Sequence, residues 1–136
     1  MANLERLRIG NSLDVQDILP IGSLTESNGF LYTYGLVPMN PETRSIEDED
    51  VQDQARVVLD NLVQILGTRG LDLDDIVMVQ IFLGNIKRDF ERFNEVYTQY
   101  FPEDPPTRYC IGATLAPLDG PEMLVEIHAI AATRST

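Results

Sequence analysis

The sequence predicts an α+β fold, a mixed β-sheet with two α-helices packed on one of its faces. Apolar residues alternate with a period of two in several short segments, the period changes to that of a helix over about 46–69 and 88–100, and Gly, Pro, Asn and Asp separate the segments. Because 136 residues suffice for one proper core and are too few for two, we expect a single domain over 1–136, with 1–19 a weakly patterned N-terminal segment at a sheet edge.

A hairpin is predicted near the start of the patterned region. The runs 23–26 and 30–34 flank Asn28-Gly29, and Asn-Gly between two such runs is a strong short-range hairpin signal. Gly35 ends the second strand, and the proline-punctuated stretch 37–43 cannot hold a regular element.

Two helices with a strand between them are expected next. The first, about 46–69, has apolar residues spaced by three and four, and Gly70 closes it. Acidic residues at its start are interpreted as helix-dipole partners rather than as a binding patch. The strand 76–83 is apolar at nearly every position, as in a strand covered on both faces. An aromatic stripe that includes Phe90 defines the second helix, about 88–100, and prolines end it.

The segments 106–115 and 124–131 are predicted to be neighbouring antiparallel strands joined by a Pro/Asp/Gly loop. Their alternation assigns one face to the core: Tyr109, Ile111, Ala113, Leu115, Val125, Ile127, Ala129 and Ala131. The opposite face then holds Arg108, Cys110, Gly112, Thr114, Leu124, Glu126, His128 and Ile130. This second face is too apolar for bare solvent and too charged for a core, so we expect a symmetric oligomer with a cleft between subunits.

Composition excludes several classes of function. The net charge of -12, with one Lys and nine Arg, argues against binding nucleic acid. No apolar run approaches the ~20 residues of a membrane span, and no secretory signal is recognisable, so we expect a cytoplasmic protein without membrane contact. A lone Cys110 fits a reducing compartment. Asp72 and Asp74 lack a third nearby acid, so no metal is expected.

Motifs spread along most of the chain, about 20–131, resemble those of the reactive intermediate deaminase (Rid, or YjgF-like) family. They are Gly35 and Pro38, Gln54-Ala55, 59–62, 75–77, 94–97 with Phe101, 106–108 and 125–127. The resemblance implies a fold similar to the small trimeric chorismate mutases, a homotrimer with three clefts between subunits, no cofactor, and hydrolysis of imines or enamines to ketones and ammonia. It further implies that Arg108 pairs with the substrate carboxylate, that Glu126 positions or deprotonates the attacking water, and that Cys110 offers backbone contacts.

This sequence departs from the family pattern at several positions. Tyr34-Gly35-Leu36 replaces a usual Ser-Gly-Gln, Ile21 replaces a closing aromatic residue, and His128 replaces a second glutamate. We expect these residues to line a bulkier and less polar pocket that prefers a larger carboxylate substrate. His128 is a candidate proton donor or pocket-lining group.

Structural interpretations of the same residues remain open. Arg108 could form an intersubunit salt bridge, Glu126 could be an exposed residue of a half-buried strand, and Cys110 is most simply a small buried hydrophobe. The leading hypothesis is an imine or enamine deaminase. The alternatives are a non-catalytic trimer that binds small carboxylates or a partner protein, and a pathway-specific enzyme that acts on another conjugated acid.

Overall fold

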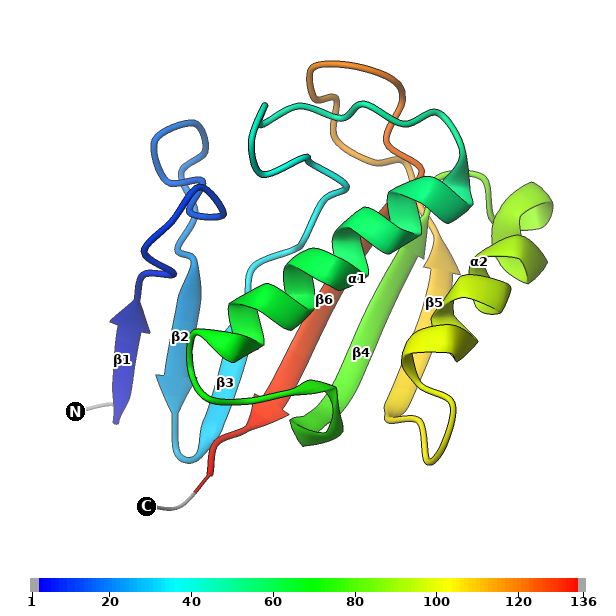
Figure 1. The fold of residues 1–136 in the computed structure, drawn as a ribbon. Helices are drawn as coiled ribbons and strands as arrows, with labels where there is room; N and C mark the ends of the chain where they lie inside the picture. The colour runs from blue at the N-terminus through cyan, green and yellow to red at the C-terminus, as the bar shows by residue number, and fades with distance from the viewer. Residues whose placement is uncertain (1–2, 135–136) are drawn as a thin grey trace.

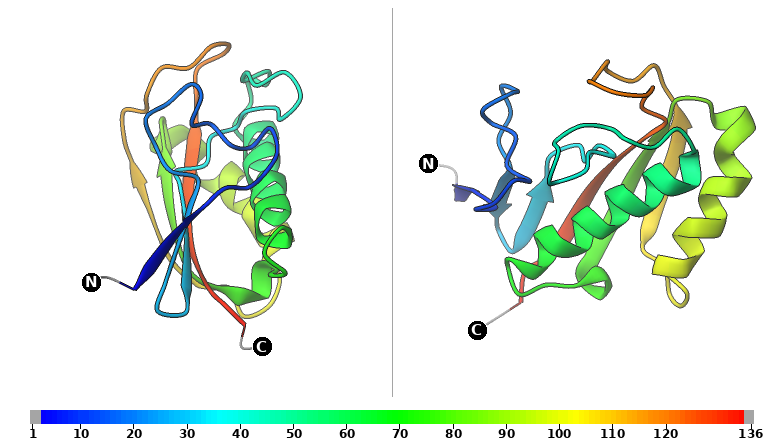
Figure 2. Two further views of the ribbon diagram at one scale, coloured as in Figure 1. Left: turned by 90° about the vertical axis from the view of Figure 1, so that its left-hand side faces the viewer. Right: turned by 45° about the horizontal axis from the view of Figure 1, so that its top comes forward.

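A computed structural model describes residues 3–134. It consists of one six-stranded mixed sheet in the order β1-β2-β3-β6-β4-β5, with both long helices on the same face (Figure 1). The strands are β1 Leu4–Leu7, β2 Leu24–Ser27, β3 Phe30–Thr33, β4 Ile76–Leu83, β5 Thr107–Gly112 and β6 Val125–Ala132. The helices are α1 Val51–Gly67, the short 3-10 helix η1 Leu73–Asp75, and α2 Ile86–Tyr100. Figure 2 shows the sheet edge-on, with the helices on one side and the other side uncovered. The predicted fold class is confirmed.

The N-terminal hairpin forms as the sequence predicts. Asn28 and Gly29 both have positive φ, 51° and 86°, which is the backbone conformation of a tight turn between twisted strands. The weakly patterned segment before the hairpin, 1–19, supplies the edge strand β1. Residues 1 and 2 of this segment lie outside the part of the chain that the structure describes. It also contributes to the interior, because Leu13 and Val15 are each only 1% exposed.

Helix α1 begins five residues later than expected. Asp50 is its N-cap and accepts a hydrogen bond from the backbone N–H of Gln52. Ile46 instead forms an isolated β-bridge with Met39 and donates its backbone N–H to the carbonyl of Asp119. The acidic stretch is therefore partly an extended loop, held by the loop that precedes β6.

The core lies between the sheet and the two helices. Helix α1 buries an apolar stripe against the sheet. Helix α2 adds Phe93 and Tyr97, and Phe101 follows the helix. The ring centre of Tyr97 lies 5.8 Å from that of Phe93 and 4.7 Å from that of Phe101. Phe90, expected in this stripe, is 40% exposed. Within residues 3–134, no helix combines the length and the hydropathy needed to cross a bilayer.

The last two strands are not neighbours, so the predicted C-terminal hairpin is wrong. Strand β4 lies between them, antiparallel to β6 and parallel to β5. The connection from β4 through α2 to β5 is the crossover that a parallel pair requires, and a long loop then carries the chain past β4 to β6. The apolar character of β4 thus reflects its central position, although only one of its faces is covered by helices.

The alternation on β6 is confirmed, but the alternation on β5 is inverted. Val125, Ile127, Ala129 and Ala131 are buried under the helices, as expected. On β5, Tyr109 and Ile111 are 47% and 44% exposed on the open face, whereas Arg108 and Cys110 turn towards the helices. The expectation failed because the open face is itself apolar, so apolar alternation does not identify the covered side. Ala113 and Leu115 lie beyond the end of β5, and Leu124 is buried rather than open.

Candidate functional site

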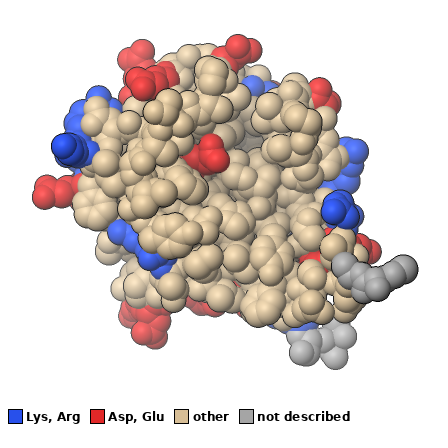
Figure 3. All heavy atoms as spheres, turned by 180° about the vertical axis from the view of Figure 1, so that it is seen from behind, with Lys and Arg blue, Asp and Glu red and all other residues tan. Residues whose placement is uncertain are grey.

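The open face of the sheet carries the candidate site. Cross-strand pairing aligns its side chains in three rows over β6, β4 and β5. The rows are Glu126–Phe82–Ile111, His128–Gln80–Tyr109 and Ile130–Met78–Thr107. Seen from this side in Figure 3, the surface is mostly uncharged, its charged groups gather mainly towards the margin, and it is hollowed beside an acidic group in its upper half. Two ionisable side chains, Glu126 and His128, therefore lie in largely apolar surroundings.

Glu126 is the carboxylate best placed for chemistry. It lies near the start of β6 and is half-buried on the open face beside Phe82. Burial raises the pKa of its carboxyl above the usual range, because the charged form loses hydration. A carboxylate with a raised pKa that is reachable from solvent can take a proton from water near neutral pH.

Gly35 lies directly against this carboxylate. A Cβ at position 35 would overlap Oε2 of Glu126, so the carboxylate occupies the space that a side chain would fill. The backbone is fixed there by two hydrogen bonds: the N–H of Leu36 donates to the carbonyl of Ile127 (2.7 Å), and the N–H of Ile127 donates to the carbonyl of Leu36 (3.0 Å). The structure thus brings Gly35 and Glu126 together.

His128 follows Glu126 on the same face. Its Nδ1 lies 3.1 Å from Oε1 of Gln80, and Nε2 of Gln80 donates to the hydroxyl of Tyr109. Burial lowers the pKa of the imidazole, because it disfavours the cation. A hydrogen-bonded row therefore crosses three strands on a largely apolar face.

Arg108 and Cys110 lie on the opposite side of the sheet from these groups. The Arg108 guanidinium stacks 4.6 Å from the ring centre of Tyr97, and its Nη2 donates to Oδ1 of Asn94 (2.7 Å). Its Nη1 is buried without a hydrogen-bond partner among the described residues. Cys110 is half-buried, and burial raises the pKa of its thiol, which favours the unreactive neutral form.

Two of the other candidate pocket residues, Tyr34 and Leu36, are engaged in contacts inside the subunit. The hydroxyl of Tyr34 donates to the carbonyl of Leu13 (2.9 Å), and burial raises the pKa of this phenol to about 12. Leu36 is 1% exposed and belongs to the core. Ile21 is 37% exposed in the loop before β2. Within one subunit, Tyr34 and Leu36 therefore do not narrow the surroundings of Glu126, because both side chains are engaged in internal packing.

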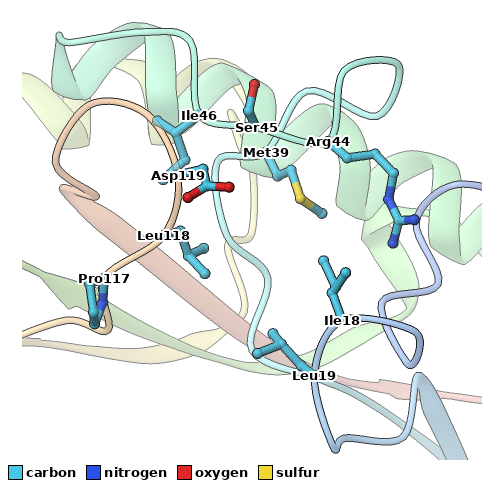
Figure 4. A pocket seen from close by; sticks show the side chains of 9 residues that line it. All are labelled: Ile18, Leu19, Met39, Arg44, Ser45, Ile46, Pro117, Leu118 and Asp119. Atoms are coloured by element: carbon cyan, nitrogen blue, oxygen red, sulfur yellow. The ribbon is translucent and has the colours of Figure 1, made fainter.

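A separate cavity of about 280 Å³ lies where three loops meet. Figure 4 shows its lining, mostly apolar with two charged groups. It is lined by Ile18, Leu19, Met39, Arg44, Ser45, Ile46, Pro117, Leu118 and Asp119. Arg44 is held by a bidentate ion pair with Asp17 (2.7 and 2.8 Å), so its charge is already matched. In the described part of the chain, no three His, Cys, Asp or Glu side chains gather as a metal-binding cluster.

Sequence reasoning missed the residues that support the site. Asn94 and Tyr97 lie three positions apart on α2, the spacing of one helix face, and both hold Arg108. Gln80 lies inside an apolar run, and a lone polar residue in such a run is the signal that could have identified it.

Comparison with known proteins agrees with the fold and the motifs. The chain matches the sequence family described as Endoribonuclease L-PSP over residues 20–133. It is 37% identical over 112 residues to a RutC family protein of Pyrococcus horikoshii, which covers 82% of this chain and 86% of the relative. It is 32% identical over 114 residues to the 3-aminoacrylate deaminase RutC of Acinetobacter baylyi, over 84% of this chain and 87% of that protein.

Solved structures give the same result. The yeast protein YEO7 superimposes with a TM-score of 0.84 at 27% identity and covers 97% of this chain and 100% of its own. The structure of Escherichia coli TdcF with bound serine has a TM-score of 0.76 at 36% identity, over 87% of this chain and 91% of its own. The family match, the identities and the shared fold together show that this chain belongs to the Endoribonuclease L-PSP family, that is, to the Rid (YjgF-like) proteins.

Proposed function

We propose that this protein is a homotrimeric hydrolase that converts a reactive imine or enamine carboxylic acid to a keto acid and ammonia, without a cofactor and in the cytoplasm. The observation that carries the proposal is the Glu126 carboxylate, half-buried on an apolar face against Gly35 with its pKa raised by burial. Two comparisons support this reading: a relative is named 3-aminoacrylate deaminase, and the structure of TdcF contains bound serine, an amino acid.

The site needs a second copy of the chain. Arg108 and Glu126 face opposite sides of the sheet, on strands separated by β4, and their registers on β4 differ by three residues, Val79 against Phe82. A strand spacing of about 4.8 Å and a rise of about 3.3 Å per residue put their backbones about 14 Å apart. Because Arg108 lies on the edge strand β5, we infer that its guanidinium reaches Glu126 of a neighbouring subunit rather than Glu126 of its own.

The apolar open face supports the same assembly. Phe30, Tyr32, Tyr109 and Ile111 are each more than a third exposed on it. Soluble monomers seldom leave such contiguous apolar surface uncovered. A second subunit on this face would cover these exposed apolar side chains and leave Glu126 in a cleft beside the contact.

Arg108 would anchor the substrate. A guanidinium pairs with a carboxylate through two parallel hydrogen bonds, which fixes orientation as well as charge. Asn94 and Tyr97 restrain the group before the ligand arrives, so less side-chain freedom is lost on binding.

Glu126 would act on water. A protonated imine is already electrophilic, so the site has to hold its carbon beside a water molecule and remove one proton from that water. Positioning of the two reactants lowers the barrier, and general base catalysis contributes about 10²–10⁴-fold.

RNA cleavage, which the family description suggests, finds no support in this chain. Its net charge of -12 opposes a phosphate backbone, and the candidate site itself contains a carboxylate. No observation favours this second function.

The decisive experiment measures ammonia released from imino acids that an amino-acid oxidase generates in situ. The wild type should accelerate release above the uncatalysed background, Arg108→Ala should raise KM, and Glu126→Gln should lower kcat. A wild type that gives no acceleration with any imino acid would overturn the deaminase and leave two alternatives, a non-catalytic trimer that binds a carboxylate or a partner protein and an enzyme that acts on another conjugated acid.

A further inference from the structure

His128 stands next to Glu126 in a geometry suited to proton transfer. The two residues are separated by Ile127 on β6 and point to the same face, so their backbones are about 7 Å apart. A substrate the size of an imino acid, or one water molecule, fits between two side chains that project in parallel from such positions. His128 is half-buried in the single subunit and is therefore not sealed in the core.

Gln80 fixes the tautomer of the imidazole. Its Nε2 donates to the hydroxyl of Tyr109, which leaves Oε1 facing the ring at 3.1 Å from Nδ1 of His128. Because a carbonyl oxygen only accepts, Nδ1 carries the hydrogen, and in the neutral ring Nε2 then holds the free lone pair. The row therefore presents a basic nitrogen on the same face as the carboxylate.

The surroundings of the ring favour its neutral form. The titratable groups that share its face on the neighbouring strands are Glu126 on β6, Tyr109 on β5 and Tyr32 on β3. Arg108 lies on the other side of the sheet. Burial lowers the pKa of the imidazole while it raises that of Glu126, so the two groups approach each other in proton affinity. A smaller difference in proton affinity lowers the cost of passing a proton between two groups.

We propose that His128 is a second acid–base residue of this site, which carries a proton between Glu126 and the leaving nitrogen, and that Gln80 is its positioning residue. The inference rests on the proposed deaminase function and deepens it. It is particular to this chain, because the sequence places a histidine where the resemblance leads one to expect a glutamate.

The proton transfers balance over the whole reaction. Glu126 takes a proton from water as the water oxygen bonds to the carbon of the protonated imine and the C=N electron pair moves to nitrogen, which gives a carbinolamine with a neutral amino group. The proton passes from Glu126 to Nε2 of His128, and the imidazolium protonates the amino group of the carbinolamine. Glu126 then takes the hydroxyl proton as the C–N bond breaks, which yields the keto acid, ammonia, neutral His128 and one proton for release to solvent.

A purely structural row would hold three strands together and do nothing more. His128→Gln separates the two roles, because an amide can still bond to Gln80 but cannot exchange protons. Gln80→Leu keeps the imidazole and removes its orienting acceptor. Tyr109→Phe removes only the hydroxyl that orients Gln80.

The test compares these variants by ammonia release as a function of pH, with circular dichroism and sedimentation to verify fold and assembly. We expect His128→Gln to lose about 10²-fold in kcat, the scale of one general acid, with KM little changed and with one limb of the pH profile absent. Gln80→Leu and Tyr109→Phe should give smaller losses and retain both limbs.

The results separate the two proposals. An active wild type with an equally active His128→Gln, or with an unchanged pH profile in that variant, would overturn the role of His128 and leave the deaminase intact. An inactive wild type would overturn both. The chain has a single histidine, so the C2–H proton resonance of His128 is directly assignable, and it should shift when pyruvate, a keto acid product, is added. If the enzyme is active but the His128 resonance does not shift with pyruvate, the result would count against contact between His128 and the bound product.

Discussion

Gly35 and Glu126 lie in direct contact, with the glutamate carboxylate filling the space that a side chain at position 35 would need. The contact explains two properties of the carboxylate at once. It holds Glu126 against backbone that is itself hydrogen-bonded to β6, and it helps to exclude water from one side of the group. A small change at position 35 should therefore reach the chemistry without touching substrate.

Gly35→Ala should displace the Glu126 carboxylate and lower kcat by about tenfold or more, since shifts of about 1 Å in a reacting group have large effects on rate. The pKa of Glu126, read from the acid limb of the rate profile, should change as well. Gly67→Ala is the matched control, because no atom lies within 4 Å of the added Cβ and its φ is not positive. Equal kinetics for the two variants would show that the contact has no catalytic consequence.

Glu126→Gln should keep the fold and the binding of a carboxylate ligand while turnover falls by about 10²-fold or more. Glu126 works as a base, so it must be deprotonated, and burial raises its pKa. In the wild type, kcat/KM should rise with pH through that raised value, and this acid limb should vanish in the variant. Unchanged turnover would reduce Glu126 to a structural residue.

Arg108→Lys should raise KM by about 10–100-fold with a smaller effect on kcat. Lysine keeps the charge but loses the paired hydrogen bonds, the stack on Tyr97 and the contact with Asn94. Steady-state kinetics with several imino acids would measure the effect. Arg69→Lys serves as control, since Arg69 is exposed and forms no ion pair within residues 3–134. Equal loss of affinity in both variants would show that the effect is not specific to Arg108 and would contradict its role as the anchor.

The assembly can be tested with two substitutions of similar exposure on different faces. Ile111 is 44% exposed on the open face, and Val63 is 41% exposed on α1. If the proposed trimer forms, Ile111→Lys should convert it to smaller species in sedimentation, because the lysine would place a charge in a contact that excludes water. Val63→Lys should leave the trimer intact. A wild type that sediments as a monomer at micromolar concentration would remove the intersubunit cleft.

Local patterns predicted the elements well, and long-range pairing accounts for the errors. The turn at Asn28-Gly29 and the helical periods of α1 and α2 depend on neighbours in sequence, so the sequence determines them directly. The insertion of β4 between β5 and β6 depends on which strands pair, and no local pattern encodes it. The sequence-based expectation put Arg108 on the wrong side of the sheet because it included neither this insertion nor the apolar character of the open face.

The candidate site could be predicted in part for the same reason. Glu126 and His128 share a face because they belong to one strand, and strict alternation fixes that relationship. The expected hairpin put Arg108 on the same face of one sheet as these two residues, and that placement was wrong. The contact between Gly35 and Glu126 depends on how the chain continues beside β6 after β3 has ended, which becomes visible only in three dimensions.

Tyr34→Phe tests whether the unusual Tyr34-Gly35-Leu36 segment sets substrate choice through its side chains. The hydroxyl of Tyr34 donates to the carbonyl of Leu13, and Leu36 is buried in the core, so neither side chain is free to line the site within a subunit. Loss of one such hydrogen bond should cost about 0.5–1.5 kcal/mol of unfolding free energy, measured by urea denaturation. The ratio of kcat/KM for phenylalanine-derived over alanine-derived imines should stay unchanged, because the hydroxyl contacts the N-terminal segment and not the substrate. A changed ratio with unchanged stability would mean that Tyr34 turns into the cleft in the assembled protein, and the expectation of a bulkier pocket would then hold.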